Sequence, residues 1–163
     1  MTKHFIIIMT LLSLMMSFSF LLKNSKSLDS MGMMNFFIDN SDSFVEYDNK
    51  RHIPISLKIK LSKLNHQRFR LVNPQKAYRK TDVVRNPFLP NKQLCFVANY
   101  GNKWVLVYNQ GGRASTVHCI LARIEKSKVI EVSDFFILQK VDNKASLIDA
   151  LKNGKYSESN IWD

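Results

Sequence analysis

The chain has 163 residues, an apolar content of 45% and a net charge of +11. This length predicts one domain rather than several, and the apolar content is sufficient for a packed core. The excess of basic residues favours anionic partners, and it also favours non-specific adhesion.

The N-terminal residues have the order of a secretion signal. A short basic start, residues 1–4, precedes 18 uncharged residues, 5–22, and two lysines follow closely. The apolar stretch is longer than a usual signal core and lacks a clean small-x-small cleavage site after it. We predict a signal peptide or membrane anchor over residues 1–27 and a single β-rich globular domain over residues 28–163. Cleavage, retention as an anchor and burial within the fold remain alternatives for the apolar stretch.

Export has consequences for location and partners. With either a cleaved signal or an anchor, we expect a secreted, periplasmic or other extracytoplasmic protein, attached to the membrane by residues 5–22 if the segment is uncleaved. This location argues against a nucleic-acid partner. It leaves anionic lipid, a polyanion or an acidic protein as expected partners.

The charges are unevenly distributed along the chain. Residues 27–49 carry five acids and no Lys or Arg, whereas residues 50–92 carry twelve Lys or Arg and one acid. From residue 93 onward the two signs are nearly balanced. We expect the acidic segment to lie on or near the basic one and to neutralise part of its charge.

Two short apolar stretches precede the basic segment. Residues 31–37 are rich in Met and Phe, and they fit a first strand, a helical turn docked on the core, or a mobile lead-in. Residues 44–47 predict a short strand. Pro54 then predicts a connection, because proline lacks an N–H for a strand ladder and biases the preceding residue toward an extended shape.

An alternating pattern in residues 55–72 predicts an antiparallel hairpin. Apolar residues at 55, 57, 59 and 61 alternate with Ser and Lys, and Phe69 and Leu71 alternate with arginines. Period two over eight residues is typical of a half-buried strand. Like charges opposed on a sheet are destabilising, and an anionic partner would relieve them; an ordinary solvated strand face is the alternative. The basic face of this hairpin is our predicted anion- or partner-binding site, formed by Lys58, Lys60, Arg68 and Arg70.

The residues after Pro90 predict a meander closed by a helix. Strands with apolar residues on both faces indicate central positions in a sheet, and short turns with Gly or Lys-Ser join them. An Asp-Asn pair precedes the helix as a cap, and Gly154 follows it. We predict an α+β, β-rich fold: an antiparallel meander, as a curved sheet or small barrel, with one C-terminal helix. The predicted strands cover residues 94–99, 104–108, 116–124 and 129–138, and the helix covers residues 144–153.

The two cysteines lie on the first and third strands of the predicted meander. Neighbouring strands are about 4.8 Å apart, so Cys95 and Cys119 should be separated by about twice that distance. A disulfide requires Cα atoms within about 7 Å, which this strand order does not allow. We expect two buried thiols, with a disulfide as the alternative if the strands belong to facing sheets.

His118 and Cys119 are adjacent, as in a base and nucleophile pair. Neighbours on a strand point to opposite faces, so this pair cannot act together. His118 could still meet a residue on a neighbouring strand, but we expect a partly buried structural histidine bonded to a backbone or side-chain partner. The other histidines lack the spacing of metal ligands, and we predict no metal site, no cofactor and no catalytic residue.

The sequence Gly111-Gly112-Arg113 can form a small anion cradle. Paired glycines expose backbone N–H groups, and Arg113 adds a fork of donors. We include Arg113 in the predicted anion-binding set. A hairpin turn, in which paired glycines are needed only for conformation, is the alternative.

The function that these observations favour is a small exported, non-catalytic binding module. Its basic hairpin face would contact an anionic surface or an acidic partner. Two alternatives remain: an extracytoplasmic hydrolase-like enzyme with a cleft near His118 and the Gly111–Arg113 turn, and a structural envelope protein without a specific ligand.

Overall fold

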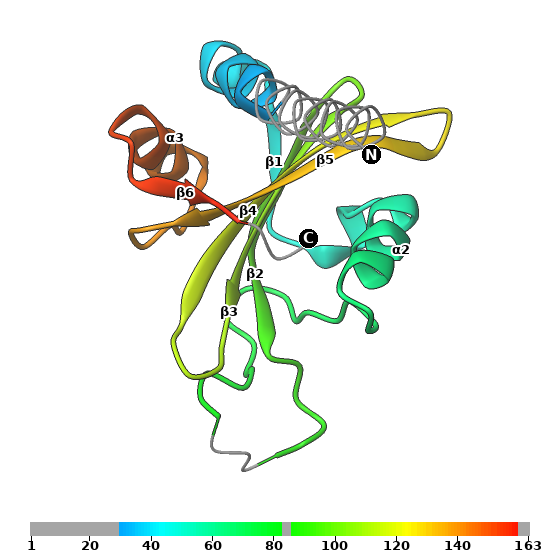
Figure 1. Cartoon of the computed structure of the whole chain (residues 1–163), viewed down its shortest axis with the longest axis vertical. Helices are drawn as coiled ribbons and strands as arrows, with labels where there is room; N and C mark the ends of the chain where they lie inside the picture. The colour runs from blue at the N-terminus through cyan, green and yellow to red at the C-terminus, as the bar shows by residue number, and fades with distance from the viewer. Residues whose placement is uncertain (1–29, 83–85, 160–163) are drawn as a thin grey trace, which may run out of the picture.

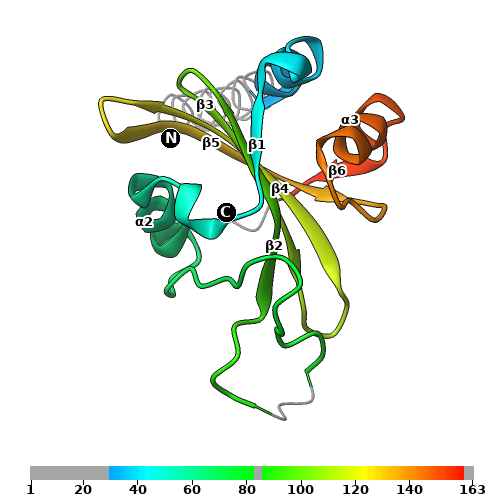
Figure 2. The same cartoon turned by 180° about the vertical axis from the view of Figure 1, so that it is seen from behind.

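The computed structural model describes residues 30–82 and 86–159, and the predicted signal or anchor lies outside them. One open sheet of six antiparallel strands forms the centre of the described part of the molecule (Figures 1 and 2). Each strand pairs with the next one in the chain, so the first and last strands are edges and the sheet is not a barrel. The strands are β1 (Val45–Tyr47), β2 (Lys92–Tyr100), β3 (Lys103–Gln110), β4 (Thr116–Glu125), β5 (Lys128–Ile137) and β6 (Tyr156–Glu158).

The meander of β2 to β5 is confirmed. Residues such as Val97, Leu106 and Ile120 are fully buried, as expected for central strands whose two faces are both covered. Two-residue turns join β2 to β3 and β4 to β5, and positive φ angles at Gly101 and Ser127 fit the twist of the adjoining strands. The short edge strand β1 also agrees with its predicted position.

Helices cover both faces of the sheet and create two hydrophobic cores. The helix over residues 30–39 and α3 (Lys144–Lys152) pack on one face, where Met34, Phe37 and Leu147 are buried. The first helix resolves the alternatives for residues 31–37, since its apolar side docks on the core. The other face is covered by α2 (Ile55–Leu64).

The predicted C-terminal helix is confirmed within one residue of its expected end. Asn143 caps α3 by accepting a hydrogen bond from the Ser146 N–H, and the Ser146 side chain returns to the Asn143 backbone. Gly154 has a φ of +65°, the left-handed conformation that favours glycine after a helix. The chain then returns as β6, a strand that the polar tail sequence does not predict.

The predicted hairpin over residues 55–72 is wrong, because its first half is α2. The apolar residues alternate, but on a helix of 3.6 residues per turn they divide into two pairs on opposite sides. Leu57 and Leu61 are fully buried against the sheet, whereas Ile55 and Ile59 face outward. Leu and Lys are good helix formers, and Pro54 stands immediately before the first helical turn.

The second half of the predicted hairpin is an extended segment that does not pair with the first half; Val72 at its end forms one parallel bridge with Gln93 of β2. Phe69 and Leu71 are buried and the arginines between and beside them are exposed, so the predicted inward and outward residues are correct there. The Phe69 N–H donates to Ser62 Oγ, which holds the segment against the last turn of α2. Two 3-10 turns, η1 (Ser41–Ser43) and η2 (Lys50–His52), connect the remaining elements.

The fold is therefore β-rich α+β, with a meander as its centre and more helix than the sequence predicts. Among the residues that the structure describes, no helix is long and apolar enough to span a bilayer.

Candidate functional site

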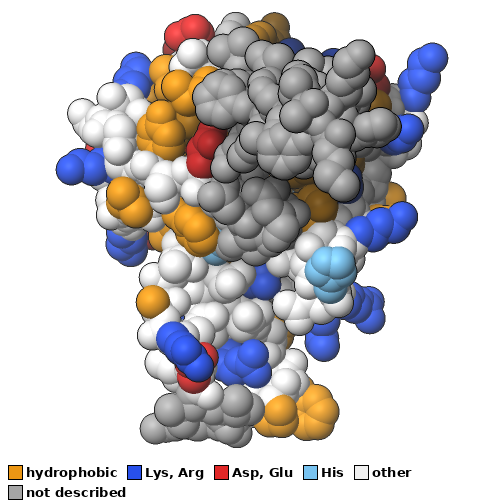
Figure 3. Space-filling model, viewed as in Figure 1, with side chains coloured by type: hydrophobic (Ala, Val, Ile, Leu, Met, Phe, Trp, Pro, Cys, Tyr) orange, Lys and Arg blue, Asp and Glu red, His pale blue; other side chains and the backbone are white. Residues whose placement is uncertain are grey.

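The outward side of α2 is both basic and apolar. Ile55 is 76% exposed and Ile59 is 51% exposed, although both are large aliphatic residues. Lysines lie between and after them on the helix, and two arginines follow in the extended segment. Lys and Arg side chains project from the side of the molecule where α2 lies (Figures 1 and 3). We call this the α2 surface: Ile55, Lys58, Ile59, Lys60, Lys63, Arg68 and Arg70.

The bases of the α2 surface have no acidic partner among the residues that the structure describes. Within residues 30–82 and 86–159, no carboxylate lies within 4 Å of the basic groups of this surface. Partial burial lowers the pKa of Lys58, and the like charge of Lys50 lowers it further. The environment of Lys58 thus disfavours positive charge, first through partial burial and then through the neighbouring charge of Lys50.

The described acids of the acidic segment, from Asp39 to Asp48, form no ion pair with the α2 surface. Glu46 instead accepts a hydrogen bond from the Lys144 N–H at the start of α3, where the helix dipole favours negative charge. The Lys144 ammonium in turn donates to the carbonyls of Ser41 and Phe44. The expected self-neutralisation is therefore not found as ion pairs among the described residues, and Asp29 lies outside them.

Four of the five predicted site residues share one region, and Arg113 does not. Lys58 and Lys60 are on α2, and Arg68 and Arg70 follow it. Arg113 lies in the turn between β3 and β4, where its guanidinium is 3.8 Å from the Asp82 carboxylate and is almost fully exposed. Ile55, Ile59 and Lys63 also belong to this surface, although the alternating pattern placed both isoleucines in the core and left Lys63 in a turn. The sequence signal for these three residues is the helical spacing of Leu57 and Leu61 after Pro54, which turns the other side of the helix to solvent.

The turn before Arg113 is not an anion cradle. The Gly111 N–H donates to the Asn91 carbonyl, and the Gly112 N–H donates to the Lys80 carbonyl. A Cβ at Gly111 would be 2.0 Å from the Arg79 carbonyl oxygen, so the glycine is needed for close approach of two backbone segments. The paired glycines fasten the loop before β2 to the sheet, and their donors are already used.

His118 is part of a buried polar group on the α2 side of the sheet. Its ring is 1% exposed, and Nδ1 lies 3.2 Å from both carboxylate oxygens of Asp134. An ionised carboxylate only accepts hydrogen bonds, so we assign the Nδ1 proton to His118. Nε2 is 3.2 Å from Thr116 Oγ1, and the ring stacks parallel on Tyr108. The ring is enclosed by protein and both its nitrogens have partners, as expected for a structural histidine.

Lys92 lies on the same side of the sheet and is only 4% exposed. Its ammonium is 5.9 Å from the centre of the Phe69 ring and makes no hydrogen bond or ion pair with another described residue. Burial lowers the Lys92 pKa, and the negative charge of Asp134 partly opposes that effect. A buried ammonium of this kind is destabilising unless a nearby anion compensates it.

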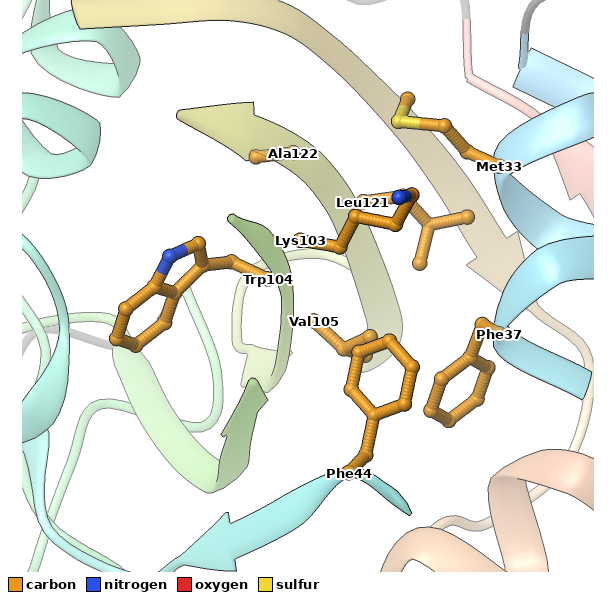
Figure 4. Close-up of a pocket in the computed structure, with 8 residues that line it drawn as sticks. All are labelled: Met33, Phe37, Phe44, Lys103, Trp104, Val105, Leu121 and Ala122. Carbon is orange, nitrogen blue, oxygen red and sulfur yellow. The ribbon is translucent and has the colours of Figure 1, made fainter. Parts of the chain in front are cut away.

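A small pocket lies between the helix over residues 30–39 and the sheet (Figure 4). Phe37 and Phe44 turn toward each other beside Val105, whereas Trp104 points to the other side. The cavity holds about 10 Å³, room for about one water molecule. Pockets for small-molecule ligands are typically about 300–1,000 Å³, so this one is a packing gap rather than a substrate site.

Cys95 and Cys119 are free thiols, as the strand order predicts; Cys119 is buried as expected, whereas Cys95 is only half-buried. Cys119 pairs with Val107 on β3, and Cys95 lies at an irregularity of β2 on the far side of β3. Burial raises the pKa of Cys95 to about 12, and burial also raises the pKa of Cys119. Neither thiol is activated as a nucleophile.

Among the described residues, no three His, Cys, Asp or Glu side chains are grouped closely enough to hold a metal ion. The chain matches no protein-family model, no curated protein and no solved structure.

Proposed function

We propose that this chain is an extracytoplasmic, non-catalytic binding module that contacts an anionic surface or an acidic partner through its α2 surface. The observation that supports this most directly is the absence of acidic partners around five exposed or half-exposed bases, within the described residues. Crowded like charges are unfavourable in the free protein, and an anionic partner converts this cost into attraction. The proposal keeps the predicted partner class and replaces the hairpin by a helix.

The geometry also supports a binding function better than a catalytic one. His118, which the sequence suggested as a candidate catalytic base, is enclosed by protein and hydrogen-bonded to Asp134 and Thr116. The thiols are held in the protonated form by burial. The α2 surface, in contrast, is open to solvent, and the buried Leu57 and Leu61 hold its helix on the core.

The experiment that tests the proposal compares two sets of charge reversals in the full chain. The chain is kept in a non-ionic detergent, since residues 5–22 are apolar. Salt elution from a dextran sulfate resin is measured for each set. The first set reverses the α2 surface, and the second reverses four exposed bases elsewhere, with the same change in net charge. The first set consists of Lys58→Glu, Lys60→Glu, Arg68→Glu and Arg70→Glu. The control set consists of Lys126→Glu, Lys128→Glu, Lys152→Glu and Lys155→Glu.

We expect the first set to elute at clearly lower salt than the control set. Equal elution of the two sets would mean that total charge rather than the α2 surface determines binding, and the proposal would be wrong. Circular dichroism of both sets is the control that checks whether the variants remain folded. Glutamine in place of glutamate provides a milder version, because Lys58 and Lys60 are half-buried.

A further inference from the structure

The α2 surface contains an aliphatic pair that binding to a soluble polyanion does not require. Ile55 and Ile59 are one helical turn apart, so their side chains lie side by side on the outward face of α2. A surface helix normally places polar residues on this face. Here the core-facing pair, Leu57 and Leu61, is already buried, so the isoleucines add nothing to the hydrophobic core.

The lysines of α2 flank this pair on both sides. At about 100° per residue, Lys58 and Lys60 lie on either side of Ile59, and Lys63 continues the outward row one turn later. Lysine stems are apolar, and their ammonium groups extend away from the helix axis. An aliphatic centre bordered by lysines is the pattern of helices that lie in the interface of a membrane.

We infer that the anionic partner is a lipid bilayer, and that α2 lies flat on it with Ile55 and Ile59 among the acyl chains and the lysines at the phosphates. This inference rests on the proposed function and names the chemical class of its partner. The isoleucines protrude from a convex helix, a shape that a deformable bilayer accepts without a preformed groove. The lysines supply charge complementarity to anionic headgroups.

The short helix predicts weak and reversible binding. Ten residues and two inserted side chains bury little apolar area, so headgroup charge contributes much of the affinity. Each Lys near an anionic membrane strengthens binding about fivefold. The contact is therefore expected to orient a protein that is already held at the membrane, in agreement with the predicted segment at residues 5–22.

The test places a polarity-sensitive fluorophore at α2 in the full chain. Ile59→Cys is labelled at neutral pH, where the buried native thiols stay protonated, and the chain is reconstituted into vesicles. Vesicles that contain phosphatidylglycerol are compared with vesicles of phosphatidylcholine alone. A label at Leu138→Cys is the matched control, since Leu138 is 65% exposed and lies outside the α2 surface.

We expect the label at position 59 to shift to the blue and to brighten at least twofold in anionic vesicles only. Lys58→Glu with Lys63→Glu should abolish the change, and Ile55→Asn should weaken it, whereas Ile130→Asn, at another exposed isoleucine, should not. The label at position 138 should give the same emission in both vesicles.

A label at position 59 that remains in water on anionic vesicles would overturn the inference. If the dextran sulfate experiment still distinguishes the two charge-reversal sets, the proposed function stands and the partner is a soluble polyanion or an acidic protein. If that experiment also fails, the proposed function fails with the inference.

Discussion

Replacement of Asp134 by alanine should reduce the free energy of unfolding by about 3 kcal/mol. Its carboxylate is fully buried and accepts the Nδ1–H of His118, a ring that is itself 1% exposed. The substitution leaves a buried donor without an acceptor, which costs about 1–3 kcal/mol. The value expected here is at the upper end of this range, because both side chains are almost completely buried.

Lys92 adds a second part to this prediction. Asp134 is the negative charge that partly compensates the buried ammonium, so its loss should leave Lys92 more unfavourable in the folded state. In a Lys92→Met background, Asp134→Ala should therefore cost about 1 kcal/mol less than in the natural chain. Asp134→Asn retains an acceptor for His118 and should cost about half as much as alanine.

Urea unfolding of the natural chain and the four variants measures these differences, and the double-mutant cycle gives the coupling between Asp134 and Lys92. A loss below about 0.5 kcal/mol for Asp134→Ala would refute the importance of the buried contact. Equal losses in both backgrounds would refute the coupling. The pH dependence supplies an independent check: because burial lowers the Lys92 pKa, the folded state releases this proton before the unfolded state does. The free energy of unfolding of the natural chain, measured relative to that of Lys92→Met, should thus rise as the pH increases toward 10.5.

Three further predictions concern other parts of the fold. Gly111→Ala should destabilise by about 2–3 kcal/mol in thermal unfolding, because its methyl would overlap the Arg79 carbonyl; Gly32→Ala, where the methyl meets nothing within 4 Å, should not destabilise. Cys95, whose pKa is raised to about 12, should resist iodoacetamide at pH 8 in the folded chain and react after unfolding, and rapid reaction of the folded chain would contradict its burial. Asn143→Ala should cost about 1 kcal/mol in urea unfolding through loss of the α3 cap, whereas no change would show that the cap is dispensable.

The sequence was most informative where local pattern and tertiary environment agree. The first two strands of the meander, β2 and β3, are largely apolar on both faces, and the turns between the strands from Lys92 to Ile137 have strong local signals, so few other arrangements satisfy them. The Asn143 cap and the stop at Gly154 defined α3 for the same reason. The separation of the two cysteines followed directly from strand order.

The hairpin prediction failed because its pattern was ambiguous. Alternation at residues 55, 57, 59 and 61 contains the i, i+4 spacing of a helix as well as the period of a strand. If every apolar residue is assumed to lie in the core, the alternation predicts a strand. The structure selects the helix, and Ile55 and Ile59 remain outside. The same error concealed part of the candidate site, since the isoleucines were assigned to the core.

The interior polar contacts were beyond prediction from sequence. That His118 would have a hydrogen-bond partner was expected, but the pairing with Asp134 depends on the register of β4 with β5, which has an irregularity near its far end. Arg113 was grouped with the other bases on chemistry alone, and only the fold separates it from them.

The order of the strands has a consequence for how the chain folds. The four central strands occupy consecutive residues, and each pairing closes a turn of two to five residues, so this part has low contact order. The pairing of β1 with β2 must instead close the long connection from Tyr47 to Lys92, and α2 lies within that connection. We expect the meander to form first and α2 to dock late. Native-state hydrogen exchange should then show α2 opening at lower free energy than the central strands, which makes the α2 surface the part of the fold that is most easily rearranged on contact with a partner.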